Sequence, residues 1–460
     1  MKKWLAKGIL GIAFAFPISG IVHAADALTV QLSNYIGNKT ALNVVLRGNY
    51  SIQNSTVTLS PNITYSVKAE SGKIRIYKDT TVVLEGTSLQ LNPSTSTTYL
   101  EIEGRKYLGI MTFKNESGVV RPYNQIDLES YLKGVVPSEM SENWGNTGGL
   151  EALKAQAVTA RTYTVAGGYT SKAYITDTQT HQVYGGYFPT YTNSIQAVDS
   201  TKGQIMTYNN APISALYSSS NGGYIESNRG AWGSTLLPYL SAKPDKFDPI
   251  NQFTYSISET ELVNKLNTKN PGYTIKAVSL ATRVGYTDGQ RTVTMRFLTT
   301  AIDGTTHTFD MDASSFRTLL GTSNIKSIYL NEPTKLSEIF TFTGQGFGHG
   351  VGMSQYGALA MSQQGYDYKN ILGFYFTGTQ LYNGSTYTNL IFTDKTLAPK
   401  IQTLATPVIA LEENPKSKPL IREAKKQKPP KPIRITAKPL EVTAKVATIV
   451  THTPKNLPPV

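Results

Sequence analysis

The chain has 460 residues, a formal net charge of +13 and 40% hydrophobic residues. This length and composition allow a large buried core in about two or three domains, which excludes a wholly disordered protein. Cysteine is absent, which excludes disulfide bonds, thiolate zinc sites and cysteine nucleophiles.

The first 25 residues have the pattern of a cleaved secretory signal peptide. Three lysines precede an apolar run at residues 8–22, and Val-His-Ala at 22–24 fits the small-x-small cleavage pattern. As a helix this run would reach only about 22 Å, less than the ~30 Å hydrocarbon core of a bilayer. We therefore expect an exported, soluble protein, with an uncleaved N-terminal anchor as the less favoured alternative.

Residues 26–104 predict a β-rich N-terminal region. Across residues 27–125, short alternating runs such as LNVVLRG, KIRIYKDTTVVLEG and YLGIMTF are separated by Asn, Gly, Ser and Pro, which is typical of antiparallel strands. We expect no helix before residue 125.

The following region, residues 105–390, predicts a domain of mixed helices and strands. Apolar residues recur at helical spacing over 149–166, and two glycines end that helix. Glu139 is expected in a turn ahead of it. Residues 183–256 read as short Tyr- and Ser-rich runs, further helices are expected at 258–267 and 313–321, and the glycines of 344–352 alternate before another helix. The predicted fold class is α+β.

The last segment, residues 391–460, predicts a basic, proline-rich, disordered tail. Residues 400–460 hold twelve Lys or Arg, four Glu and ten Pro, and proline combined with like charge resists compact folding. Two interpretations remain open: a solubilising tether, or electrostatic attachment to an anionic wall polymer. Nucleic acid does not suit an exported chain.

Five segments carry a resemblance to a known family, whereas the common HExxH, GxSxG and P-loop motifs are absent. The segments are GVVPSEM (134–140), ALKAQAVTARTY (152–163), TDTQTHQVYGG (176–186), YSSSNGGYIES (217–227) and GFGHGVGMSQYGA (346–358). In this order and at these separations they resemble the SpoIID/LytB family of sporulation and amidase-enhancer proteins, over roughly residues 105–385. The resemblance implies a SpoIID-like core.

The resemblance also implies a cell-wall substrate, the glycan strands of peptidoglycan. SpoIID-type members are lytic transglycosylases that prefer strands stripped of peptide stems, and LytB-type members enhance an N-acetylmuramoyl-L-alanine amidase. Cleavage and non-catalytic enhancement therefore remain alternatives here, as do sporulation and vegetative wall turnover. The resemblance assigns the catalytic role to Glu139.

The chemistry of a lytic transglycosylase needs only one carboxyl group, because the 6-hydroxyl of muramic acid serves as the nucleophile. A general acid needs a raised pKa, which burial of Glu139 beside Val135, Val136, Pro137 and Met140 would provide. The alternative is that Glu139 only caps a helix. Glu142 is the nearest rival carboxylate, and Asp127 and Glu129 are local alternatives.

Further residues in the five segments are expected to bind the substrate: Gln156, Arg161, His181, Gln182, Tyr184, Ser219, Ser220, His349, Ser354 and Gln355. Gln156 and Arg161 differ by about 140° around a helix, so only one can face a ligand fully. Arg161 is expected to contact substrate, because pairing with Glu139 would lower the pKa of that carboxyl. Ser218 stands where family members often have histidine. We expect no cofactor and no metal site, since two histidines are too few.

Overall fold

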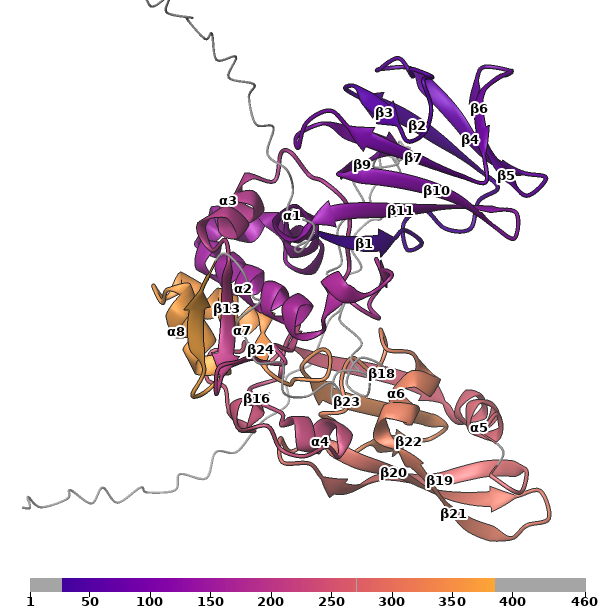
Figure 1. Ribbon diagram of the computed structural model, residues 1–460. Helices are drawn as coiled ribbons and strands as arrows, with labels where there is room; N and C mark the ends of the chain where they lie inside the picture. Colours follow the sequence, from indigo (N-terminus) through magenta and orange to yellow (C-terminus); the bar gives the residue numbers. More distant parts are fainter. Residues whose placement is uncertain (1–26, 270, 385–460) are drawn as a thin grey trace, which may run out of the picture. The chain divides into compact units, whose positions relative to one another are not determined.

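The computed structural model describes residues 27–269 and 271–384, shown as coloured ribbon in Figure 1. These residues all belong to the first of two units of the chain, Met1–Glu412. The predicted signal peptide and the predicted tail lie outside the described residues. The described part contains both helices and strands in several sheets, which confirms the α+β class. Within it, no helix has the length and apolar character needed to span a bilayer.

The N-terminal part consists of strands only, as predicted. They are β1 (Ala27–Gln31), β2 (Ala41–Arg47), β3 (Tyr50–Ile52), β4 (Thr64–Glu70), β5 (Lys73–Lys78), β6 (Thr81–Gly86), β7 (Ser88–Pro93), β8 (Tyr99–Ile102), β9 (Arg105–Leu108), β10 (Ile110–Glu116) and β11 (Val119–Asp127). One sheet has the order β12-β1-β11-β10-β7-β3, with β12 at Ile175–Thr176, and the other has the order β6-β5-β4-β2-β8-β9. Strands on both sides of residue 104 share these sheets.

Alternating side chains form the core between the strands. In β2, Leu42, Val44 and Leu46 are buried, while the intervening side chains are exposed or partly exposed. Because side chains alternate between the two faces of a strand, such a pattern buries one face only. These residues join one continuous hydrophobic core with the helices that follow.

The helix α1 (Leu128–Glu139) was missed by the sequence analysis, which placed Glu139 in a turn. Asp127 caps its N-terminus by accepting a bond from the backbone N–H of Ser130 at 3.0 Å. Pro137 lies inside the helix, in its last turn, which the sequence analysis took for irregular chain. The Ser138 hydroxyl donates to the Gly134 carbonyl at 2.7 Å in the same turn. The expectation of a turn at Glu139 was therefore wrong.

The central helices follow α1 along the chain. They are η2 (Glu142–Thr147), α2 (Leu150–Ala166), η3 (Tyr169–Ser171), α3 (Thr192–Ser200), α4 (Asn228–Trp232) and η4 (Pro238–Leu240). The prediction of a helix at 149–166 is confirmed, and Gly167 forms its C-cap. Residues 183–256 hold the helices α3 and α4 where only short runs were expected, because both are short and polar. Figure 1 shows α1, α2 and α3 gathered together, and these helices contact one another.

Short strands connect the central helices with later parts of the chain. They are β13 (Gln204–Tyr208), β14 (Ala211–Pro212), β15 (Tyr217–Ser218), β16 (Tyr224–Ile225), β17 (Lys243–Pro244), β24 (Met353–Ser354) and β25 (Gln380–Asn383). The parallel pair of β15 and β24 sets Tyr217 beside Met353 and Ser218 beside Ser354. The helices α7 (Gln355–Gln363) and α8 (Tyr368–Tyr375) follow β24. This pairing joins two of the family-like segments.

A second hydrophobic core lies between these two segments in the sequence. Its elements are β18 (Gln252–Ser258), α5 (Glu259–Asn267), β19 (Ile275–Tyr286), β20 (Thr292–Ala301), β21 (Thr306–Asp312), α6 (Ala313–Leu320), β22 (Thr334–Leu336) and β23 (Ile339–Gln345). The helices predicted at 258–267 and 313–321 are confirmed as α5 and α6. Their buried residues, among them Leu262 and Phe316, pack with the strands in a core separate from the first. We call residues 252–345 the inserted segment.

Candidate active site

Glu139 lies at the buried end of α1. Residues 128, 131, 132, 135, 136 and 139 follow one face of the helix, and all of them are buried. Glu139 is the last residue of this stripe and is 1% exposed. Its place on the stripe explains why a carboxylate is buried here.

The two carboxyl oxygens of Glu139 have different surroundings. Oε1 accepts a hydrogen bond from the backbone N–H of Val183 at 3.0 Å. Oε2 receives no hydrogen bond of normal geometry from the described residues, although the nearby Tyr217 hydroxyl lowers the pKa of the carboxyl. One buried oxygen is thus available for a proton.

Burial raises the pKa of Glu139 from 4.5 to about 7, and the bonds from Val183 and Tyr217 offset only part of this effect. Desolvation disfavours the charged form, whereas donors to the carboxylate favour it. Both the protonated and the ionised form of Glu139 are therefore accessible near neutral pH. This is the pKa range that suits a general acid and base.

The three rival carboxylates each have a structural partner. Asp127 caps α1, and Glu129 binds Arg161 at 2.7 Å. Glu142 accepts bonds from the backbone N–H groups of Asn193 and Ser194 at 2.7 and 2.9 Å, which caps the start of α3. Of these four carboxylates, Glu139 is the one with a buried oxygen that lacks a partner.

Gln182 connects Glu139's neighbour Tyr217 to α2. Its Oε1 accepts a bond from the Thr164 hydroxyl at 2.9 Å, and its Nε2 donates to the Ala160 carbonyl at 3.3 Å. The same Nε2 donates to the Tyr217 hydroxyl oxygen at 3.4 Å. Because the Tyr217 oxygen accepts this hydrogen bond, the hydroxyl hydrogen of Tyr217 points away from Gln182. The group that the hydroxyl affects is the carboxyl of Glu139, whose ionised form it favours.

The last of the five family-like segments also contacts Glu139. Gln355 Nε2 donates to the backbone carbonyl of Glu139 at 3.1 Å. His349 accepts a bond at Nδ1 from the Val351 N–H at 3.0 Å, and its ring also bonds the backbone of Tyr217. Desolvation lowers the pKa of His349 to about 3, so the ring is neutral. The structure therefore brings Glu139, Gln182, Gln355 and His349 together around Tyr217.

Gln156 is a second buried group that has no partner among the described residues. It is 0% exposed, and neither Oε1 nor Nε2 makes a hydrogen bond. On α2 it stands one turn before Ala160, which contacts Gln182, and two turns before Tyr163, which interacts with Glu139. Its role in binding substrate stays a prediction.

Arg161 is buried and fully engaged within the protein. Its Nε and Nη2 donate to the two oxygens of Glu129 at 2.9 and 2.7 Å, and Nη1 and Nη2 donate to the carbonyls of Gln204 and Val198. These bonds tie α2 to α1, α3 and β13. In this arrangement Arg161 holds the helices together and offers its guanidinium to no ligand. It does not pair with Glu139.

The remaining predicted site residues lie in the surrounding framework. His181 accepts a bond from the Thr176 N–H at 3.2 Å, and burial lowers its pKa to about 4. Tyr184 is fully buried and donates to Asn124 at 2.9 Å. The hydroxyls of Ser220 and Ser354 both donate to Asp248, at 2.8 and 2.7 Å, and the Ser219 carbonyl accepts from Ser354.

Two acidic residues that no motif indicated, Asp245 and Asp248, organise this framework. Asp248 joins the Ser220 and Ser354 segments, and Asp245 accepts bonds from Asn221 and Tyr375 at 2.6 and 2.8 Å. They lie outside the five family-like segments, so no motif indicated them. Their positions between aromatic and proline residues, in KPDKFDPI, were the available signal.

The glycine-rich loop of residues 344–352 packs closely against neighbouring parts of the chain. An added Cβ at Gly346 would lie 2.9 Å from the Ser220 carbonyl, and one at Gly350 would collide with the Arg291 guanidinium. Both glycines have positive φ, which disfavours any side chain. Arg291 in turn donates to the carbonyls of Asn221 and Tyr224 and lies 3.7 Å from the buried Glu226. Close backbone approach therefore explains the alternating glycines.

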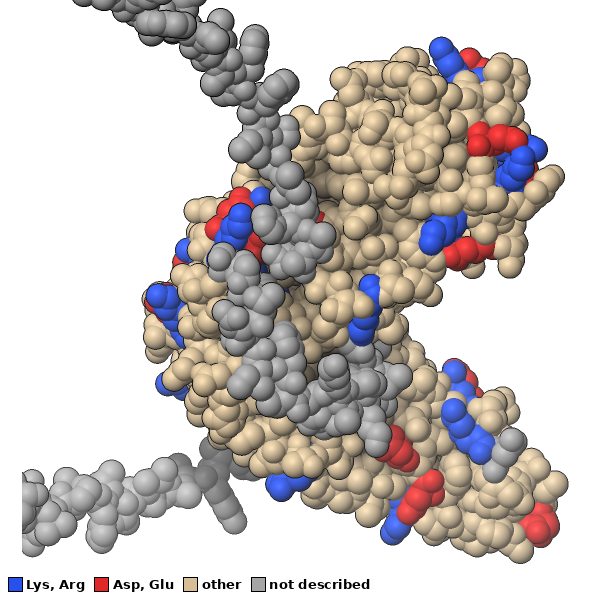
Figure 2. Space-filling model, in the orientation of Figure 1, with Lys and Arg blue, Asp and Glu red and all other residues tan. Residues whose placement is uncertain are grey.

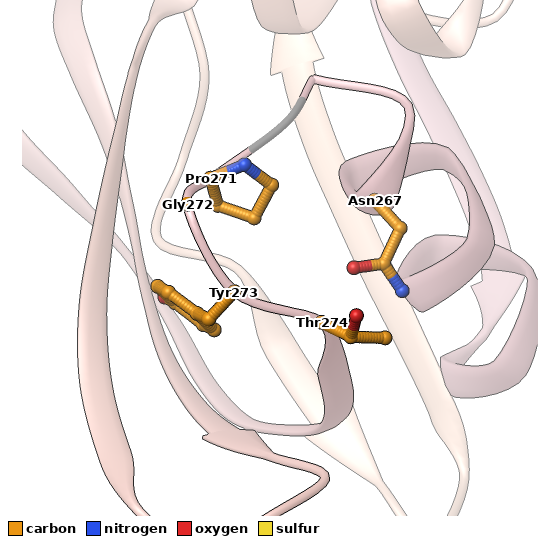
Figure 3. Close-up of a pocket in the computed structure, with 5 residues that line it drawn as sticks. All are labelled: Asn267, Pro271, Gly272, Tyr273 and Thr274. Carbon is orange, nitrogen blue, oxygen red and sulfur yellow. The ribbon is translucent and has the colours of Figure 1, made fainter.

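Two hollows on the described surface lie away from Glu139. One is lined by Asn267, Pro271, Gly272, Tyr273 and Thr274, at the end of α5 (Figure 3). Another is lined by residues 49–52, 55–58 and 94. Neither includes a predicted site residue. Residues 27–269 and 271–384 also contain no group of three His, Asp or Glu placed to hold a metal ion.

Comparison with known proteins places the chain in a family. Residues 116–208 match the family model described as SpoIID, stage II sporulation protein. Stage II sporulation protein D of Bacillus subtilis (strain 168) is 35% identical over 296 residues, which cover 59% of this chain and 80% of that protein. The amidase enhancer of the same organism is 34% identical over 410 residues, or 78% of this chain.

This chain therefore belongs to the SpoIID/LytB family. It spans only 56% of the length of the amidase enhancer. A protein of Brachyspira hyodysenteriae with no described function is 31% identical over 338 residues, covering 70% of this chain and 87% of that protein. The matched family region contains α1, Glu139 and α2.

Proposed function

We propose that the protein acts on the cell wall by binding the glycan strands of peptidoglycan and cleaving them as a lytic transglycosylase. The observation that carries this proposal is the buried Glu139 carboxyl, with one oxygen lacking a partner and a pKa of about 7. The similarity to stage II sporulation protein D supports a role of this kind. Glu139 acts as the general acid and base.

The proposed reaction uses Glu139 twice. The protonated carboxyl gives its proton to the glycosidic oxygen as the bond from C1 to that oxygen breaks. The 6-hydroxyl of the same muramic acid then attacks C1 and returns its proton to the carboxylate. The product is a 1,6-anhydro ring, no water is consumed, and Glu139 ends protonated as it began. A second carboxylate is not required, in contrast to ordinary glycosidases.

The test compares the mature protein with two neighbouring variants. Peptide-free glycan strands are incubated with wild type, Glu139→Gln and Glu142→Gln, and 1,6-anhydromuramic ends are measured by mass spectrometry. We expect such ends from wild type and from Glu142→Gln, since the glutamine amide keeps one acceptor oxygen for the start of α3. We expect none from Glu139→Gln. Folded wild type that produces no anhydro ends would refute cleavage.

A second candidate function is non-catalytic enhancement of an N-acetylmuramoyl-L-alanine amidase. It is favoured by the 1% exposure of Glu139, because a general acid must come within about 3 Å of the glycosidic oxygen. Cleavage thus requires the side chains over Glu139 to move, whereas enhancement does not. The similarity to the amidase enhancer supports this alternative. Equal stimulation of a wall amidase by wild type and Glu139→Gln, without anhydro ends, would establish it.

We also propose that the protein is exported and attached to the wall through its basic C-terminal residues. Residues 27–384 hold 28 Lys or Arg and 25 Asp or Glu, a net charge of +3, whereas residues 400–460 carry +8. On the face shown in Figure 2, acidic and basic side chains lie in mixed groups. Deleting residues 400–460 should release the protein from isolated walls, and unchanged retention would contradict this attachment.

A further inference from the structure

An aromatic pair lies beside Glu139 at the surface. Trp144 belongs to η2, Tyr356 to the first turn of α7, and their ring centroids are 5.1 Å apart with planes tilted by 56°. Tyr356 is 39% exposed and Trp144 is partly exposed. Because the rings are tilted and not stacked, neither covers the other's face completely, and aromatic faces remain available to a ligand.

The pair is held in place by the same contacts that surround Glu139. Gln355, the residue before Tyr356, donates to the Glu139 carbonyl at 3.1 Å, and the backbone N–H of Tyr356 donates to Ser219 at 3.0 Å. The helix η2 with Trp144 begins three residues after Glu139. Trp144 and Tyr356 thus belong to two segments, distant in sequence, that meet at the backbone of Glu139.

The polar groups around the pair suit a neutral ligand. The Glu142 carboxylate is occupied by Asn193 and Ser194, so its charge is already paired with donors at the start of α3. Asn143, next to Trp144, is exposed and can exchange hydrogen bonds with hydroxyl groups. Aromatic faces that cover C–H groups, with an amide at their edge, match the chemistry of a pyranose ring.

We propose that Trp144 and Tyr356 form a subsite that binds a sugar ring of the glycan next to Glu139. The inference rests on the proposed function, because it takes the ligand to be peptidoglycan glycan. It adds Trp144, which lies between two family-like segments, to Tyr356, which lies inside the segment 346–358. The ligand class is the neutral N-acetylated pyranose ring of a peptide-free strand, the sugar that lacks the lactyl carboxylate of muramic acid.

The test measures binding in a protein that cannot cleave. The parent is Glu139→Gln combined with Trp232→Phe, so that Trp144 is the reporter after removal of residues 1–25, where Trp4 lies. Peptide-free glycan oligosaccharides are titrated, with tryptophan emission and calorimetry as readouts. We expect a saturable change in emission and binding weakened about tenfold by Tyr356→Ala, the loss of roughly one stacked ring. Tyr286→Ala, an exposed tyrosine of the inserted segment, is the matched control and should bind as the parent does.

Two results separate failure of the subsite from failure of the proposed function. If the parent binds glycan and folded Tyr356→Ala binds equally well, the subsite is refuted and the function stands. If the parent binds no glycan, the proposed function itself fails. Should Tyr356→Ala not fold, the parent with Trp232 restored and Trp144→Ala introduced is titrated by calorimetry: we expect weaker binding, and binding as tight as that of the parent would overturn the subsite.

Discussion

The raised pKa of Glu139 predicts that removing its charge stabilises the protein at high pH. The folded-state pKa, about 7, exceeds the ordinary value of 4.5, so the carboxyl releases its proton more easily in the unfolded chain. The contribution of Glu139 to stability is therefore fully present below pH 4.5 and is lost as the pH rises toward 7. Above pH 7 both states are ionised and the loss levels off.

The size of the effect follows from the same two values. The penalty is about 1 kcal/mol at pH 5 and about 3 kcal/mol at pH 8, since each pKa unit corresponds to about 1.4 kcal/mol. Glutamine carries no charge, so Glu139→Gln should gain about 2 kcal/mol relative to wild type between pH 5 and pH 8. The glutamine Nε2 takes the place of the unpartnered Oε2, which adds a constant cost that does not depend on pH.

The assay is urea unfolding of both proteins between about pH 4.5 and 8.5, with Glu142→Gln as the control. The difference in unfolding free energy between Glu139→Gln and wild type should grow with pH and become constant above about pH 7, whereas the control should not show this growth. A difference that stays flat from about pH 5 to 8 would mean that Glu139 has an ordinary pKa, and the proposed general acid would lose its physical basis.

Three further substitutions test the surroundings of the site. Tyr217→Phe removes the phenol hydroxyl, which lowers the pKa of Glu139 by favouring the ionised carboxylate. For an interaction of about 1 kcal/mol this pKa should rise by about 0.7, seen as a later plateau in the same urea series; an earlier plateau would contradict this. Arg161→Met removes the arginine that pairs with Glu129 and should lower the free energy of unfolding, measured with denaturant, by about 3–5 kcal/mol. Arg296→Met, in an exposed pair, should lower it by less than about 1 kcal/mol, and equal losses would argue against a structural role for Arg161. Gly350→Ala places a methyl group against Arg291 at a positive φ and should destabilise the protein by about 1–3 kcal/mol or more. Gly373→Ala, in α8, meets open space and should stabilise it by about 1 kcal/mol. Both effects are measured as shifts of the thermal midpoint, and a tolerated Gly350→Ala would contradict the packing role of the loop.

The sequence predicted the elements that have strong periodicity. The helix at 150–166 and the strands of the N-terminal part follow from the spacing of their apolar residues, and α5 and α6 follow from similar patterns. The helix α1 was missed because Gly134 and Pro137 are helix-breaking signals, although its buried stripe overrides them. Tertiary packing decided this case against local propensity.

Within the site, sequence patterns indicated which residues gather but not what each one does. Glu139, Gln182, His349 and Gln355 do lie together around Tyr217. The partner of Arg161 could not be predicted, because Glu129 lies 32 residues earlier, on α1, a helix that the sequence analysis missed. The surroundings of Glu139 depend on the placement of Tyr217, which comes from a strand formed only when two distant segments pair.

The inserted segment has ends that meet. Gln252 and Gln345 are register partners at the ends of β18 and β23, so the chain leaves and re-enters the site region at nearly one point. Its separate core makes it replaceable by a short linker of a few residues, without opening the β15–β24 pair. Residues 287–291 and Lys326 are exceptions. Thr287, Gly289 and Arg291 contact Glu226, and Asp288 accepts from Ser227 and pairs with Arg229. Arg291 also donates to the carbonyls of Asn221 and Tyr224, and the Lys326 carbonyl accepts from Gly348. An excised protein would therefore also need Glu226→Gln, and such a minimal form would show whether glycan chemistry requires the insertion at all.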